Sequence, residues 1–176
     1  MNKLNIVILA AGMGKRMQSS VPKVLHELGG KPLLMHVIDT ARVLLPNKIC
    51  VVYGYGGEIV REQIIDEDIV WIEQVEQLGT GHALMQALPM LDQESMTLVL
   101  FGDVPLVKIA TLQKLIEAAQ DACSLLTANL ELPKGYGRII REAEGNSVVG
   151  IVEEKDATNE QKQITEINTG VMVVPN

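Results

Sequence analysis

The chain has 176 residues, of which 47% are hydrophobic and 21% charged, so its composition predicts a folded globular domain and excludes a disordered segment. The formal net charge of −7 argues against a nucleic-acid partner, because nucleic-acid binders carry a basic face. No apolar run approaches the roughly 20 residues of a membrane span, and the N-terminus lacks the pattern of a signal peptide. We therefore expect a cytoplasmic protein with no membrane partner. We expect Cys50 and Cys123 to be buried, reduced thiols, with one disulfide as the alternative.

Strand-like and helix-like segments alternate along most of the chain. Apolar runs rich in β-branched residues predict strands at 6–10, 48–53, 68–72, 96–101 and 123–130. Apolar residues at helical spacing predict helices at 33–44, where Pro32 stands at a suitable first position, and at 58–65, 81–91 and 109–119. This alternation is typical of βα units, so we expect a Rossmann-like α/β fold with a mostly parallel sheet and helices on both faces.

The pattern changes after about residue 130, where helical spacing gives way to strand-like segments. These segments lie at 137–141, 148–152 and 164–174 and are separated by polar turns. They predict a β-rich addition to the sheet. The chain ends directly after an apolar run, so we expect residues 1–176 to form a single domain that is a piece of a longer protein.

The first predicted strand leads into a glycine-rich, basic loop with the sequence LAAGMGKRM at residues 9–17. A dinucleotide-binding GxGxxG motif or a Walker A loop starting at Gly12 would need a glycine at position 17, where Met17 stands. Glycines still allow close backbone approach to phosphate oxygens, and Arg16 and Lys23 add positive charge. A solvated basic loop is the alternative, but the position directly after the first strand favours phosphate binding.

A second motif, FGDVP at residues 101–105, follows the fourth predicted strand. A carboxylate at the tip of a central strand is well placed to hold a Mg²⁺ ion that bridges nucleotide phosphates, which indicates Asp103 as a metal ligand. Gly102 would leave room for a ligand beside the backbone. The alternative is that Asp103 only caps the next turn. The basic loop expected at the same sheet edge favours the metal.

The segment 74–82 combines glutamine side chains with a glycine turn, which can read the edge of a nucleobase. Thr80 could also be the N-cap of the helix expected at 81–91. We expect His82 to pack at the helix start without a catalytic role. Glu153 and Asn168 lie at strand ends, where they could hydrogen-bond sugar hydroxyls or an acetamido group. Composition alone favours the alternative, which is ordinary turn chemistry.

The sequence offers no arrangement for covalent catalysis. Its serines lack a G-x-S-x-G context, and its three histidines lack metal-ligand spacing. The chemistry indicated is therefore positioning and charge neutralisation, which suits phosphoryl or nucleotidyl transfer.

The motifs, and the order in which they follow one another along the chain, resemble those of sugar-1-phosphate nucleotidylyltransferases. The first loop marks the superfamily, and the later motifs at 74–83, 102–106, 135–139, 151–158 and 166–170 make the resemblance specific. Together they resemble the N-terminal uridyltransferase half of the bacterial bifunctional GlmU family, in which an N-acetylglucosamine-1-phosphate uridyltransferase is joined to a glucosamine-1-phosphate acetyltransferase. The resemblance runs through essentially the whole chain.

The resemblance implies that UTP and N-acetylglucosamine-1-phosphate react to give UDP-N-acetylglucosamine and pyrophosphate, with Mg²⁺ as cofactor. It implies that the product is used in peptidoglycan and lipopolysaccharide synthesis. It implies two catalytic cations that neutralise the phosphates: Arg16 and Lys23. The implied nucleotide contacts are Leu9, Ala10, Ala11, Gly12 and Lys23, with Gln74, Gly79 and Thr80 on uracil. The implied metal ligand is Asp103, with Phe101 and Gly102 beside it. The implied sugar contacts are Gly137, Glu153 and Asn168.

Some features of the family depart from this sequence or would lie beyond it. Phe101 stands where the family often has a tyrosine, so a hydroxyl contact is lost. A second metal ligand and the β-helix acetyltransferase domain, which forms a homotrimer, would lie beyond residue 176. We therefore expect this chain alone to be weakly active or inactive. The alternatives are a nucleotidylyltransferase for another sugar phosphate and a non-catalytic nucleotide-sensing module of the same fold.

Overall fold

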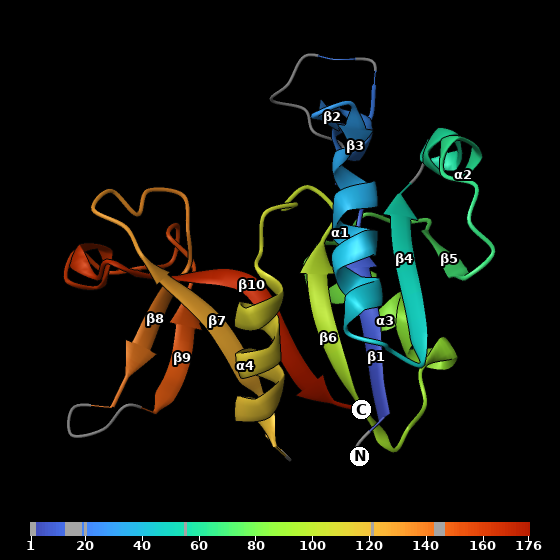
Figure 1. The fold of residues 1–176 in the computed structure, drawn as a ribbon. Helices are drawn as coiled ribbons and strands as arrows, with labels where there is room; N and C mark the ends of the chain where they lie inside the picture. Colours follow the sequence, from blue (N-terminus) through green and yellow to red (C-terminus); the bar gives the residue numbers. More distant parts are fainter. Residues whose placement is uncertain (1–2, 13–18, 20, 55, 121, 143–146) are drawn as a thin grey trace. The chain divides into compact units, whose positions relative to one another are not determined.

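The computed structural model describes residues 3–12, 19, 21–54, 56–120, 122–142 and 147–176 (Figure 1). The chain divides into two compact units, of which the first contains Met1–Ser124 and Met172–Asn176 and the second contains Leu125–Val171. Each unit is described by itself.

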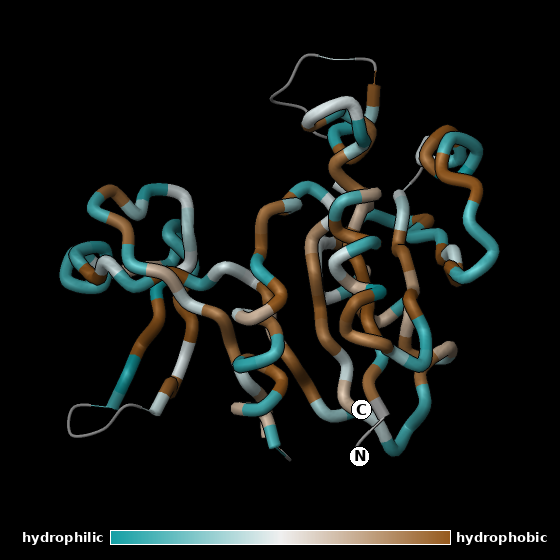
Figure 2. The backbone as a smooth tube through the Cα atoms, viewed as in Figure 1, coloured by the Kyte–Doolittle hydropathy of each residue, from teal (hydrophilic) through white to brown (hydrophobic). Residues whose placement is uncertain are grey.

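The first unit is built around a parallel sheet with the strand order β5-β4-β1-β6. Its strands are β1 (Lys3–Leu9), β4 (Lys48–Gly54), β5 (Ile69–Gln74) and β6 (Ser95–Phe101). The end of β10 (Glu166–Pro175), from Met172 onward, pairs antiparallel with β6. Figure 2 shows hydrophobic stretches along these central strands, as expected for strands covered on both faces.

Helices cover both faces of this sheet. The helices of the unit are α1 (Leu33–Val43), α2 (Glu58–Gln63), α3 (Thr80–Ala87) and α4 (Ile109–Ala119). On β1, Val7 and Leu9 pack in one cluster with Ala83 and Ala87 of α3. Because successive side chains of a strand point to opposite faces, the residues between them face the other side, which α1 covers (Figure 1). No helix among the described residues has the length and apolar character needed to cross a membrane.

Short elements complete the unit. They are the 3₁₀ turns η2 (Lys23–Leu25) and η3 (Leu88–Met90) and a hairpin of β2 (Glu27–Leu28) and β3 (Lys31–Pro32). The helix expected at 81–91 is shorter than predicted, because Pro89 has no N–H for the helical ladder and the chain tightens into η3. Pro32 precedes α1 as its N-cap residue, one position earlier than expected.

The second unit is antiparallel, as expected for a β-rich addition. It contains β7 (Ser124–Asn129), β8 (Arg138–Arg141), β9 (Val148–Val152), the 3₁₀ turn η4 (Gln161–Gln163) and the first part of β10. β8 pairs with both β9 and β10, and β7 also pairs with β10. The confirmed architecture is thus a mostly parallel sheet with helices, followed by antiparallel strands.

The order of the strands marks a ligand position in the first unit. From β1 the chain moves outward to β4 and β5, then returns to place β6 on the other side of β1. In open α/β sheets, ligands bind where the strand order reverses, outside the carboxyl ends of the strands. Leu9 and Phe101 end β1 and β6 in the same register, so the segments that follow them share this position.

The two cysteines differ in exposure, which corrects the expectation that both are buried. Cys50 is fully buried in β4, and burial raises the pKa of its thiol. Cys123 is exposed, because it precedes β7 instead of lying inside the strand. Both are free, so the alternative of a disulfide is not found.

We expect only one thiol of the native protein to react rapidly with a disulfide reagent such as DTNB, because the thiolate is the reactive form and Cys50 is shielded. Cys123→Ser removes the fast phase, whereas Cys50→Ser leaves it. Two fast thiols in the folded wild-type protein would contradict the burial of Cys50.

Candidate functional site

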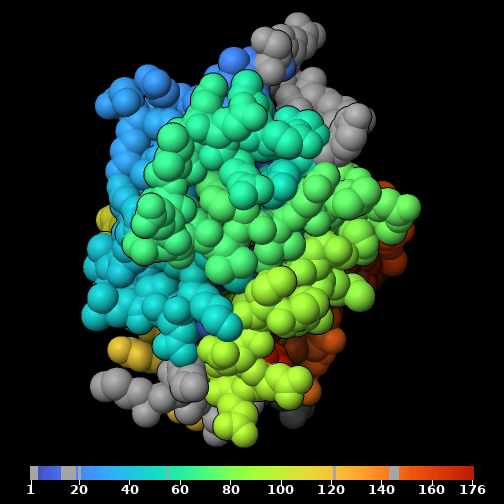
Figure 3. All heavy atoms as spheres, turned by 90° about the vertical axis from the view of Figure 1, so that its right-hand side faces the viewer, coloured from blue at the N-terminus to red at the C-terminus, as the bar shows by residue number. Residues whose placement is uncertain are grey.

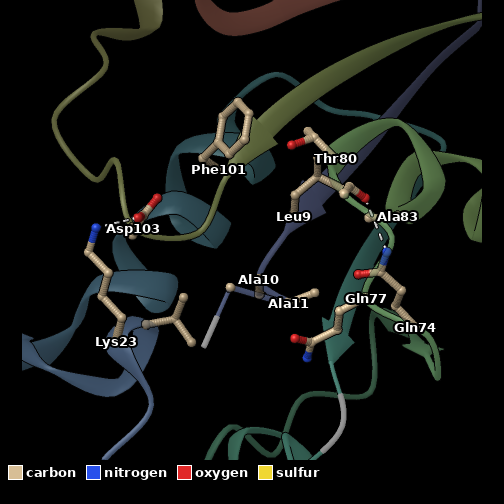
Figure 4. Close-up of a pocket in the computed structure, with 13 residues that line it drawn as sticks. Leu9, Ala10, Ala11, Lys23, Gln74, Gln77, Thr80, Ala83, Phe101 and Asp103 are labelled. Carbon is tan, nitrogen blue, oxygen red and sulfur yellow. Dashed lines mark hydrogen bonds and ion pairs between the residues drawn. The ribbon is translucent and has the colours of Figure 1, made fainter. Parts of the chain in front are cut away.

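A cavity of about 480 Å³ lies at the carboxyl ends of the parallel strands in the first unit (Figure 4). Of the described residues, thirteen line it: Leu9, Ala10, Ala11, Gly12, Lys23, Val24, Gln74, Gln77, Gly79, Thr80, Ala83, Phe101 and Asp103. They come from the ends of β1, β5 and β6, from η2 and from the start of α3. Figure 3 views the molecule from its β5 side, where α2 and the segments after β5 make up most of the face.

The floor of the cavity is main chain that continues from β1. The Ala10 N–H donates to the Val52 carbonyl at 2.8 Å, which extends the ladder between β1 and β4 by one residue. Beyond it, a side chain at Gly12 would meet no atom of the described residues within 4 Å. Alanine methyl groups and a glycine leave this main chain open to the close approach of phosphate oxygens.

At one end of the cavity, Lys23 and Asp103 form an ion pair (Figure 4). Lys23 is the first residue of η2, and Asp103 follows β6 by two residues. The Lys23 Nζ donates to Asp103 Oδ2 at 2.6 Å, while the two side chains keep 41% and 29% of their surface exposed. Such a partly exposed pair contributes little to stability, about 0–1 kcal/mol, so both charges can exchange partners at small cost.

The donor set fits a magnesium ion that arrives together with phosphates. Among the described residues, no three His, Cys, Asp or Glu side chains gather as a metal site. Of the described residues that line the cavity, Asp103 alone carries a carboxylate. Mg²⁺ is commonly held by one or two carboxylates together with substrate phosphates and water, so a single aspartate is sufficient for this mode of binding.

At the opposite end of the cavity, a buried glutamine side chain is fixed by hydrogen bonds. Gln74, the last residue of β5, is only 2% exposed, and its Nε2 donates to the Gly79 carbonyl at 3.1 Å. Its Nε2 also lies 3.0 Å from Nδ1 of His82. Gly79 has a φ of +107°, a conformation that favours glycine, and this conformation sets the direction of its carbonyl.

The start of α3 corrects the expectation for Thr80. The helix begins at Thr80 itself, so Gly79 is the N-cap residue, and no side chain caps this end. The Gly79 carbonyl accepts the first helical bond, from the Ala83 N–H at 3.0 Å. The Thr80 side chain lies at the cavity (Figure 4).

The sequence indicates the glutamines of segment 74–82 together as candidate base readers but does not single out Gln77, which the structure places at the cavity. A methyl group on Gly54 would overlap Gln77 Nε2 and lie 2.8 Å from the Ala11 carbonyl oxygen. The absence of a side chain at position 54 therefore lets the Gln77 amide lie beside the floor. The signal that could have found it was the glycine at the end of the second long strand.

The structure brings most of the predicted nucleotide residues together. The cavity is lined by ten of them: Leu9, Ala10, Ala11, Gly12, Lys23, Gln74, Gly79, Thr80, Phe101 and Asp103. Gly102 is not among the lining residues. Its missing side chain makes room for Leu34, Val24 and Ala10, and its N–H is bonded to the Leu9 carbonyl. The expected room for a ligand beside Gly102 is therefore not found, while its contact with substrate stays a prediction, and Arg16 lies outside the described residues.

The predicted sugar residues converge within the second unit. The Asn168 N–H donates to the Gly137 carbonyl at 2.9 Å, and a methyl group on Gly137 would lie 3.1 Å from Glu153 Oε1. Asn168 Oδ1 accepts the Gly170 N–H at 2.8 Å, which leaves its amide nitrogen to donate. The neighbouring Glu166 is paired with Arg141, which holds its pKa at about 2.

The sequence profile of the MobA-like NTP transferase domain family matches residues 6–137. The chain belongs to this family. The matched range contains every residue that lines the cavity of the NTP transferase domain.

The relatives confirm the resemblance to the GlmU family. The chain is 59% identical over 177 residues to the bifunctional protein GlmU of Nitrosospira multiformis and 61% identical over 178 residues to that of Nitrosomonas europaea. Both alignments cover 100% of this chain, but 38% and 39% of the relatives. The chain thus spans about two fifths of the length of these relatives.

A solved structure supports the fold. A UDP-glucose pyrophosphorylase complexed with UDP-glucose superimposes with a TM-score of 0.74 over 99% of this chain and 76% of that one. The sequence identity is 18%, so this likeness concerns the fold alone. It agrees with the expected Rossmann-like class of the NTP transferase domain.

We expect Gly54→Ala to lower the free energy of unfolding by about 1–3 kcal/mol, because the new methyl group would lie 2.8 Å from the Ala11 carbonyl oxygen and the backbone has to shift to relieve this contact. Urea denaturation measures the change. Gly150→Ala is the matched control, since a methyl group there meets no atom within 4 Å. Equal stability of the two variants would contradict the close packing between β4 and the floor.

Proposed function

We propose that the domain is a uridylyltransferase, which joins UTP and N-acetylglucosamine-1-phosphate to UDP-N-acetylglucosamine and pyrophosphate. The observation that carries the proposal is the polarity of one cavity. The ion pair of Lys23 and Asp103 lies at one end of the cavity. The Gln74 amide, fixed by its hydrogen bond to the Gly79 carbonyl, lies at the other. A nucleoside triphosphate has the same two-ended chemistry, and the relatives of 59% and 61% identity are named as GlmU proteins.

In the proposed complex, the base lies at Gln74, Gly79 and Thr80, and the triphosphate follows the floor to Lys23. Lys23 then exchanges Asp103 for phosphate oxygens and neutralises the leaving pyrophosphate, a role that Arg16 shares. Asp103, freed from Lys23, would hold the Mg²⁺ ion, which when bound supplies further charge neutralisation on the phosphates. When Lys23 leaves Asp103 for the phosphates, the Asp103 carboxylate would pair with Mg²⁺ instead, so it stays paired with a cation.

The proposed reaction is a direct displacement. A phosphate oxygen of the sugar phosphate forms a bond to the α-phosphorus of UTP while the bond from that phosphorus to the bridging oxygen breaks. The electron pair of that bond leaves with pyrophosphate. In this reaction the protein contributes orientation and charge. No serine, cysteine or histidine is among the described residues that line the cavity, and the Lys23 amine is paired with Asp103.

The second unit would hold the sugar. Glu153 can accept a hydrogen bond from a sugar hydroxyl, and the Asn168 amide nitrogen, which has no hydrogen-bond partner among the described residues, can donate one, with Gly137 between them. We propose further that the whole protein carries a glucosamine-1-phosphate acetyltransferase, assembles as a homotrimer and acts in cell-wall synthesis in the cytoplasm. These properties concern a length of chain beyond the two fifths matched here.

A panel of nucleoside triphosphates and sugar phosphates tests the proposal through pyrophosphate release and, for this chain alone, through calorimetric binding with Mg²⁺. We expect UTP to bind in preference to the other triphosphates and N-acetylglucosamine-1-phosphate to be the preferred acceptor in any turnover. Preference for another sugar phosphate would support a different nucleotidylyltransferase. UTP binding without turnover in the full-length protein would support a nucleotide-sensing module instead.

We expect Asp103→Asn to lower magnesium-dependent turnover of the full-length protein by about 10²–10³-fold, because one charged group that stabilises the transition state is lost. The fold should be unaffected, since the Lys23 pair is partly exposed. Glu67→Gln is the matched control, an exposed carboxylate of the same unit away from the cavity. Full activity of Asp103→Asn would remove Asp103 as the metal ligand.

A further inference from the structure

The orientation of the Gln74 amide is decided by its neighbours. A carbonyl oxygen can only accept hydrogen bonds, so the Gln74 atom that faces the Gly79 carbonyl at 3.1 Å must be the amide nitrogen. The amide oxygen then points the other way. Figure 4 shows it turned toward Ala11 and the interior of the cavity. No donor among the described residues is bonded to this oxygen.

The same amide nitrogen lies 3.0 Å from Nδ1 of His82. Because the nitrogen carries two protons and Gly79 takes one, the second is directed to His82, whose Nδ1 must accept it. A neutral imidazole that accepts at Nδ1 carries its own proton on Nε2. His82 is half-buried in the first turn of α3, so the helix holds the ring in place.

Gln86 stands on the other side of the imidazole, one helical turn further along α3. Its amide nitrogen lies 3.1 Å from His82 Nε2 and donates a long hydrogen bond of 3.4 Å to the His82 carbonyl. A half-turn of the amide, which hardly changes its shape, gives up this long bond and presents the Gln86 oxygen to the Nε2 proton. The ring is then bonded at both nitrogens, and the tautomer that accepts from Gln74 is stabilised.

We propose that His82 is a positioning residue that holds the Gln74 amide oxygen toward the cavity and thereby selects a pyrimidine that donates a proton at N3. Uracil carries N3–H, whereas cytosine has an accepting nitrogen at that position. An acceptor fixed in the wall therefore pairs with uracil and leaves cytosine unpaired. A freely turning amide would offer its NH₂ group to cytosine, so the preference depends on holding the amide. The inference rests on the proposed function, because it assumes that the cavity takes a nucleotide.

Calorimetric binding of UTP and of CTP, each with Mg²⁺ and without sugar phosphate, tests the proposal. We expect His82→Leu, which removes the acceptor, to reduce the ratio of UTP to CTP affinity by roughly tenfold. His82→Asn should restore most of the ratio, because its side-chain oxygen is as many bonds from Cα as Nδ1 is and also accepts. Equal weakening of both nucleotides in His82→Leu would overturn the proposal, because a purely structural role acts on both alike.

Long-range ¹H–¹⁵N NMR of the imidazole nitrogens gives a readout that needs no functional variant. We expect His82 to be neutral with its proton on Nε2, and the His82→Asn spectrum assigns its signals among the three histidines of the chain. A proton on Nδ1 would overturn the proposal even if His82→Leu fails to fold. Failure of the wild-type protein to bind any nucleoside triphosphate would instead overturn the proposed function.

Discussion

The site depends on one constraint, the strand order β5-β4-β1-β6, in which β6 lies on the opposite side of β1 from β4 and β5. Because these strands are parallel, their carboxyl ends meet at one edge, and the segments that leave β1 and β6 have to diverge. Leu9 and Phe101 are partners in register at this edge. The floor after Leu9 and the carboxylate after Phe101 are therefore neighbours, although about half of the chain separates them.

The two ends of the cavity differ in how firmly their polar groups are held. The Lys23–Asp103 pair is exposed and formed by one hydrogen bond, so it can rearrange when charged ligands arrive. The Gln74 amide is buried, and its nitrogen serves two neighbours. The first arrangement suits charge that changes during a reaction, and the second suits a choice between bases that differ by one hydrogen. The phosphate end of the cavity can thus change its ion pairs, whereas the base end keeps one fixed hydrogen-bonding group.

Sequence patterns were sufficient for the architecture, and the resemblance to the GlmU family supplied most of the residues that line the cavity. Alternating apolar periodicities predicted the long strands and helices, and the position of glycine and acidic residues after strands predicted which loops meet. The patterns could not say that Lys23 pairs with Asp103, since a distance between residues 80 positions apart depends on the whole sheet. They also predicted room for a ligand beside Gly102, whereas the side chains of Leu34, Val24 and Ala10 take up that space. Which side of a strand end faces a ligand is a property of packing rather than of local sequence.

The single carbonyl of Gly79 has two tasks, because its oxygen accepts both the Ala83 N–H, which starts α3, and the Gln74 amide. Fraying of the first turn of α3 would therefore free the Gly79 carbonyl, and with it the Gln74 amide that we propose contacts the base. Choice of nucleotide and local folding of a helix are then one equilibrium, so heat or mild denaturant should erode selectivity before the domain as a whole unfolds.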